Sequence, residues 1–131
     1  MNWKVTAIVC LLLWVVLGLA DAIVVEFSAE PQRNKIVLRW KTGQEDGVSK
    51  FFVERSLNNQ NYTQIGEVAP KGSNSRYEFV DDNLPGVKSL YYYRLRISKT
   101  DGTSQYTESI SVIPNLSGFA KTWGSIKALF Q

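Results

Sequence analysis

Hydrophobic and polar residues alternate along most of the chain after residue 22, and this two-residue period restricts the possible folds more than any other feature. The clearest example is LYYYRLRIS, Leu90 to Ser98. One face of this segment carries Tyr91, Tyr93, Leu95 and Ile97, and the other carries Tyr92, Arg94 and Arg96. Clusters of Gly, Pro, Asn and Asp separate such runs. The pattern predicts an all-β sandwich or barrel rather than a helical or α/β domain.

Seven strands are expected between these turn clusters. They are Ile23–Ser28, Lys35–Lys41, Phe51–Ser56, Tyr62–Val68, Arg76–Val80, Leu90–Ser98 and Ser104–Ile113. The Asp101-Gly102 pair predicts a hairpin turn before the last strand. In the second strand, Ile36, Leu38 and Trp40 share one face, so we expect Trp40 to lie in the core.

Residues 5–20, VTAIVCLLLWVVLGLA, form an apolar run that predicts export. As a signal peptide, the run ends in the small residues Ala20 and Ala22, which fit a cleavage site that leaves Ile23 as the new N-terminus. As a membrane anchor, it is slightly shorter than the ~20 residues that span a bilayer core. Both interpretations of residues 1–22 place the rest of the chain outside the cytoplasm.

Residues 114–131 follow the last expected strand and change the hydrophobic period. Leu116, Phe119, Trp123, Ile126 and Phe130 recur at helical spacing, which predicts an amphipathic helix. We expect its apolar face to dock on another protein, and the alternatives are its own domain and a membrane interface. In a sandwich whose first and last strands begin and finish at opposite poles, the N-terminal segment and this tail leave the domain at opposite ends.

Composition excludes several kinds of chemistry. The chain has 15 Lys and Arg against 12 Asp and Glu, and these basic residues are scattered, so no nucleic-acid partner is expected. The chain has no histidine, and Cys10, its one cysteine, lies in the apolar N-terminal run. Catalysis by His or Cys and metal sites built from them are therefore excluded from the domain. The sequence predicts no enzyme, no cofactor and no small-molecule substrate.

Two acidic clusters interrupt the strands. Glu45-Asp46-Gly47 and Asp81-Asp82 each supply too few oxygen ligands at loop spacing for a calcium site. Asp81-Asp82 is expected to cap turn amides at the exit of its strand.

The outward face of the sixth strand is a candidate contact surface. Tyr92, Arg94 and Arg96 are of residue types enriched in binding hot spots, and they form a candidate second contact face. Glu54, which is expected to point outward, and Glu108 are predicted to pair with Arg94 or Arg96 on a solvated face rather than to form a glycosidase pair.

Several segments resemble fibronectin type III-like modules of exported and cell-surface bacterial proteins. The resemblance is carried by VLRW at 37–40, FFVERS at 51–56, IGEV at 65–68, YEFVDDNLPG at 77–86, YYYRLR at 91–96, and DG at 101–102 followed by QYTESISV at 105–112. It implies a seven-strand immunoglobulin-like sandwich over residues 23–113 with Trp40 in its core. It also implies that Tyr91 hydrogen-bonds back toward the preceding corner.

Together these features predict a non-catalytic accessory subunit of a larger membrane assembly, whether respiratory, photosynthetic or secretory. Residues 1–22 would hold the chain in the membrane, residues 23–113 would form a periplasmic domain, and residues 114–131 would dock to the assembly. The alternative is a secreted or surface binding module for carbohydrate or protein.

Overall fold

The computed structural model describes residues 22–86 and 89–116. Most of the expected N-terminal segment and most of the expected C-terminal helix therefore lie outside the described residues. Within the two described ranges, no helix has the length and hydrophobicity that a membrane crossing requires.

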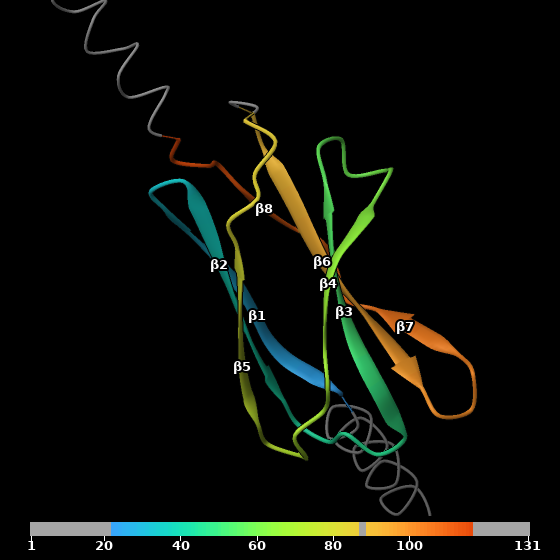
Figure 1. Ribbon diagram of the computed structural model, residues 1–131. Coiled ribbons are helices and arrows are strands. Elements are labelled where there is room, and N and C mark those ends of the chain that lie inside the picture. Colours follow the sequence, from blue (N-terminus) through green and yellow to red (C-terminus); the bar gives the residue numbers. More distant parts are fainter. Residues whose placement is uncertain (1–21, 87–88, 117–131) are drawn as a thin grey trace, which may run out of the picture.

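The described chain is all-β, as predicted, with strands arranged in two antiparallel sheets (Figure 1). The strands are β1 (Val24–Gln32), β2 (Lys35–Thr42), β3 (Val48–Ser56), β4 (Thr63–Val68), β5 (Arg76–Asp81), β6 (Tyr91–Lys99), β7 (Ser104–Tyr106) and β8 (Ile110–Val112). One sheet has the order β1-β2-β5. The other has the order β4-β3-β6-β7, and β8 also pairs with β6.

Three strand predictions were wrong in their extent, and one of them is β3, which begins at Val48 rather than at Phe51. The first strand does not stop before Pro31 but continues to Gln32, because β1 is an edge strand and the missing N–H of proline removes no required ladder bond there. The expected strand Ser104–Ile113 is instead β7 and β8, separated at Thr107. The Thr107 hydroxyl accepts a hydrogen bond from Leu95 N at 2.9 Å and takes the place of a ladder carbonyl.

The facing sides of the two sheets form one hydrophobic core. Its fully buried members include Ile36, Leu38 and Trp40 from β2, as predicted, together with Phe51 and Val53 from β3. The Trp40 indole stacks on Tyr77 with ring centroids 5.2 Å apart and an interplanar angle of 8°. The two residues are cross-strand partners in the pairing of β2 with β5.

A glycine allows a close contact between the two sheets. A Cβ on Gly66 of β4 would lie 2.3 Å from the ring of Phe79 on β5. No side chain fits there unless the ring moves, so the Phe79 ring packs directly on the backbone of β4 at the edge of the core.

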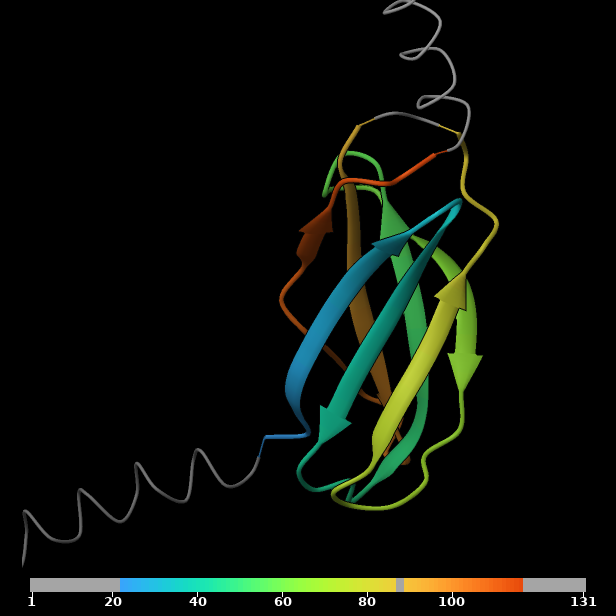
Figure 2. The ribbon, with the colours of Figure 1, turned by 90° about the vertical axis from the view of Figure 1, so that its left-hand side faces the viewer.

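The described chain begins and ends at opposite poles of β2 (Figure 2). At one pole Gly43 N donates to Ile23 O at 2.8 Å, and at the other Asn34 N donates to Asn115 O at 2.8 Å. Because Asn34 precedes β2 and Gly43 follows it, the full length of that strand separates the two ends.

Candidate functional site

In the described part of the chain, the domain has three clusters of polar side chains and one cleft. Two clusters are buried between or beside the sheets, and the third lies on the outer face of the five-stranded sheet.

The first cluster surrounds Glu45, a residue that is 8% exposed. Thr42 and Tyr77 donate their hydroxyl protons to Glu45 Oε2 at 2.7 and 2.6 Å, and Gly72 N donates to Oε1 at 2.9 Å. One carboxylate thus ties the loop after β2 to the loop before β5. The acidic cluster at Glu45 is a structural clamp, because its oxygens are occupied by donors from the chain itself.

The second cluster surrounds Asp81, and its predicted role as a turn cap was wrong. Asp81 is 4% exposed, and Arg55 Nη1 donates to both of its carboxylate oxygens at 2.8 and 2.7 Å. The Tyr93 hydroxyl donates to the same carboxylate at 2.6 Å. The residue faces inward because it continues the buried alternation of β5, where Tyr77 is also buried.

The predicted hydrogen bond of Tyr91 was also wrong. Its hydroxyl is buried and meets no hydrogen-bond partner within the described part of the chain. Tyr93, the next inward residue of β6, makes the bond instead because it pairs with Arg55, which itself reaches Asp81. A hydrogen bond therefore does link β6 to the end of β5, but it comes from Tyr93 and not from Tyr91.

The third cluster contains the predicted stripe. Arg94 Nε donates to Glu54 Oε1 at 2.7 Å and Arg96 Nε donates to Glu54 Oε2 at 3.2 Å. The prediction that Glu54 pairs with these arginines is confirmed, but the predicted solvated face is not, because the Glu54 side chain is only 10% exposed. Tyr92, half-buried, lies beside them on the same strand. Among the described ion pairs, none involves Glu108.

Aromatic rings that were not predicted from the sequence cover the two arginines. The Arg94 guanidinium carbon lies 3.9 Å from the centre of the Tyr62 ring and 4.3 Å from that of Tyr106, and the Arg96 guanidinium carbon lies 4.0 Å from that of Phe52. The hairpin at Asp101-Gly102 sets the pairing of Arg96 with Tyr106, so this neighbour could have been found from the sequence. Tyr62 could not, because it reaches Arg94 across β3.

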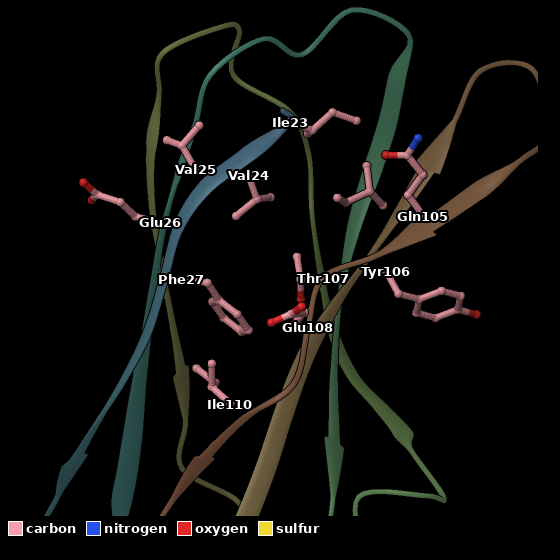
Figure 3. A pocket seen from close by; sticks show the side chains of 11 residues that line it. Ile23, Val24, Val25, Glu26, Phe27, Gln105, Tyr106, Thr107, Glu108 and Ile110 are labelled. Atoms are coloured by element: carbon pink, nitrogen blue, oxygen red, sulfur yellow. The ribbon is translucent and has the colours of Figure 1, made fainter. Parts of the chain in front are cut away.

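A cleft of about 370 Å³ opens between the start of β1 and the segment that joins β7 to β8 (Figure 3). Its apolar lining includes Phe27, Ile97 and Ile110, and Glu26 and Glu108 line it as well. Glu26 lies 3.7 Å from Arg76 in an exposed ion pair. Within the described ranges, no group of three or more His, Cys, Asp or Glu residues could hold a metal ion.

Comparisons with known proteins concern the fold. No protein-family model and no curated protein matches the sequence. A solved structure of pectate lyase Pel3 from Pectobacterium carotovorum is similar, with a TM-score of 0.51 and 22% identity over 67% of this chain and 26% of that one. Pectate lyase PelI from Erwinia chrysanthemi, in complex with tetragalacturonic acid, has a TM-score of 0.51 and 12% identity over 66% of this chain and 27% of that one.

A β-1,2-glucanase from Parabacteroides distasonis is also similar, with a TM-score of 0.48 and 17% identity over 71% of this chain and 13% of that one. The chain thus matches about a quarter or less of the length of each enzyme. At identities this low, the likeness concerns the arrangement of strands alone.

The residues predicted to form the docking helix are mostly outside the described chain. Leu116 is half-buried at its end, whereas Phe119, Trp123, Ile126 and Phe130 lie beyond the described residues.

The buried tyrosines predict a loss of stability at alkaline pH. Burial, and then the Glu45 carboxylate, raise the pKa of Tyr77 to about 12, and burial with the Asp81 carboxylate also raises the pKa of Tyr93. The folded state therefore holds these protons more tightly than the unfolded state does. The free energy of unfolding should be unaffected by these groups below about pH 10 and fall as pH rises toward 12.

Urea titrations monitored by circular dichroism at a series of pH values measure this loss. The variant Tyr77→Phe is less stable at neutral pH, because it loses the bond to Glu45, but its stability should decline less steeply above pH 10. Equal slopes in the variant and the wild type would contradict the assignment.

Proposed function

We propose that this chain is a non-catalytic accessory subunit of a larger membrane assembly. In this proposal, residues 1–22 hold the chain in the membrane, a fibronectin type III-like domain of the immunoglobulin-like class lies on the extracytoplasmic side, and the helix in residues 114–131 docks to the assembly.

The observation that carries the proposal is the position of the two chain ends. Ile23 lies beside Gly43 and Asn115 lies beside Asn34, at opposite poles of the domain. A strand of eight residues such as β2 separates the poles by ~26 Å at a rise of ~3.3 Å per residue. A domain that stands on an N-terminal anchor therefore presents its C-terminal segment away from the bilayer, where a protein partner can receive it.

The buried carboxylates also support a structural role. Glu45, Glu54 and Asp81 each accept hydrogen bonds from two or more groups of the domain itself. A general acid or base must exchange its proton with a substrate, and these carboxylates are held by cations and hydroxyls that the fold supplies.

Fractionation of membranes from the source organism tests the proposal. The full chain should stay in the membrane pellet after carbonate washing and should migrate with a complex larger than itself on a native gel. Removing residues 117–131 should leave the domain folded, because β8 and the Arg33–Asn115 bridge remain. The same deletion should abolish migration with the complex, since losing a buried aromatic anchor costs about 2 kcal/mol or more at an interface.

Trp123→Glu is the finer variant, because it places a charge on the expected docking face without shortening the chain. A mature protein that begins at Ile23 and is fully released by the wash would refute the anchor. A shortened protein that stays in the complex would refute docking by the tail.

A second candidate function is an exported binding module for carbohydrate or protein. The observation that favours it is the aromatic and arginine face of the five-stranded sheet, where the rings of Tyr62 and Tyr106 both stack on the Arg94 guanidinium. On the outer face of the smaller sheet, by contrast, Arg39 pairs with Glu30 and Glu78.

A further inference from the structure

Each outer face of the domain carries a cluster of three ion-paired residues, and the two clusters differ in exposure and in net charge. On the three-stranded sheet, Arg39 pairs with Glu30 and Glu78, and these side chains are 47–56% exposed. On the five-stranded sheet, Glu54 pairs with Arg94 and Arg96, and these side chains are 10–29% exposed. The first triad has one cation and two anions, and the second has the reverse. The second therefore carries an uncompensated positive charge held close to the protein surface.

The Arg94 side chain is held in place, but not all of its hydrogen-bond donors meet an acceptor in the described part of the chain. Tyr62 and Tyr106 stack on its guanidinium, and its Nε donates to Glu54. A guanidinium has five N–H donors, and in the described part of the chain neither Nη atom of Arg94 meets a hydrogen-bond acceptor. The site thus presents a rigid fork of donors that suits a carboxylate, with little entropy left to lose on binding.

Besides Glu54 and Arg96, the residues around Arg94 on this face are aromatic or carry hydroxyl or amide groups, and Glu67 lies beside Phe52 in an ion pair with Lys50. Cross-strand partners share a face, so the register places Ser111 beside Tyr92, Ser104 beside Ser98, and Gln64 beside Glu54. The face has no aliphatic residue among these pairs. Protein interfaces are depleted in serine and have apolar cores, whereas a sugar offers hydroxyl groups to serine and glutamine and an apolar ring face to tyrosine.

We propose that the outer face of the five-stranded sheet binds an acidic polysaccharide through the carboxylates of its uronate residues. Arg94 Nη1 and Nη2 receive one carboxylate, and the open side of the Tyr106 ring, whose residue is 55% exposed, supports the apolar face of a sugar ring. Arg96, which donates Nη2 to Gln64, adds positive charge beside the site. This inference deepens the second function proposed above and is independent of the membrane-assembly role.

Isothermal titration of the detergent-solubilised full chain tests the proposal with three probes: a galacturonate oligomer, a neutral galactose oligomer of the same length, and poly-L-glutamate. The galacturonate oligomer should bind, and its affinity should fall with added salt. The neutral oligomer and poly-L-glutamate should each bind at least about tenfold more weakly, because each lacks one of the two contacts that the site offers.

Variants locate the site on the domain. Arg94→Ala and Tyr106→Ala should each weaken galacturonate binding by about tenfold or more, and Tyr106→Phe should retain it. Arg39→Ala, on the opposite face, is the matched control and should leave binding unchanged. Tyr106 is exposed, so its variants remain informative even if Arg94→Ala unfolds the domain.

The outcomes test separately whether the ligand is a polysaccharide and whether its carboxylate is bound. Equal binding of poly-L-glutamate would refute the polysaccharide and leave a binding module for acidic peptides. Equal binding of the neutral oligomer would refute the carboxylate contact. Absence of binding by all three probes, or binding that survives both Arg94→Ala and Tyr106→Ala, would overturn the proposal, and the first of these results would also count against the binding module.

Discussion

Replacing Trp40 with alanine is expected to unfold the domain under conditions in which the wild-type protein is stable. The Trp40 side chain is 1% exposed and contacts both sheets, stacking on Tyr77 and lying 6.0 Å from the ring of Phe51. Truncation of a large buried aromatic residue to alanine costs ~3–5 kcal/mol, and small domains have ~5–15 kcal/mol in total. The measurement is the urea midpoint followed by far-UV circular dichroism.

Trp40→Phe is the matched control. The indole Nε1 is buried and meets no hydrogen-bond partner within residues 22–86 and 89–116, so phenylalanine removes ring volume but no hydrogen bond. We expect this variant to keep most of the stability and the fold. A folded Trp40→Ala protein with normal stability would show that the residue is not part of the core.

Replacing Asp81 with alanine is expected to be about as damaging. The substitution leaves the Arg55 guanidinium, whose side chain is 14% exposed, and the Tyr93 hydroxyl without their shared acceptor. Removing one partner of a buried ion pair costs ~3–5 kcal/mol, because the remaining charge stays desolvated and unpaired. A fall in the thermal midpoint, measured at neutral pH, reports this cost.

Two controls separate the ion pair from the hydroxyl. Tyr93→Phe removes only the hydroxyl donor and should cost ~1–2 kcal/mol. The double variant Arg55→Met/Asp81→Leu replaces both charges with apolar side chains and should be more stable than Asp81→Ala alone, since no unpaired charge remains. If Asp81→Ala and Tyr93→Phe were equally mild, the pair with Arg55 would contribute little to stability.

The two predictions concern both the fold and the proposed functions. The Arg55–Asp81 pair joins β3 of the five-stranded sheet to β5 of the smaller one, and Trp40 fills the space between the sheets. Both therefore hold the rigid frame on which Arg94 and its rings are displayed. Substitution of Trp40 or Asp81 should abolish binding at the outer face only by unfolding the domain. Arg94→Ala, by contrast, should weaken binding by removing a contact with the ligand.

The sequence alone determined the all-β class, most of the strands and the centre of the core. The alternation in Lys35 to Lys41 and in Leu90 to Ser98 depends on neighbours two residues apart, and it correctly placed Trp40 and the inward residues of β6 in the core. The Asp101-Gly102 turn was also predicted, and Gly102 adopts a φ of 88°, which favours glycine. These features are local, so a single chain segment carries all the information that they need.

The pairing of Glu54 with Arg94, 40 positions away, was predicted, but only the tertiary structure decided that Glu54 is largely buried. The tertiary structure also decided that Asp81 is held by Arg55, 26 positions away, rather than capping a turn. The same alternation that identifies an outward position cannot say whether aromatic rings from other strands will cover it. Tyr62 and Tyr106 cover Arg94 because pairing of β6 with β7, and of β3 with both β4 and β6, brings them to one face. The Asp101-Gly102 turn fixes the first of these pairings locally, whereas the pairing of β3 with β6 depends on the whole sheet. The sequence therefore determined the elements, and long-range pairing of strands built the candidate site.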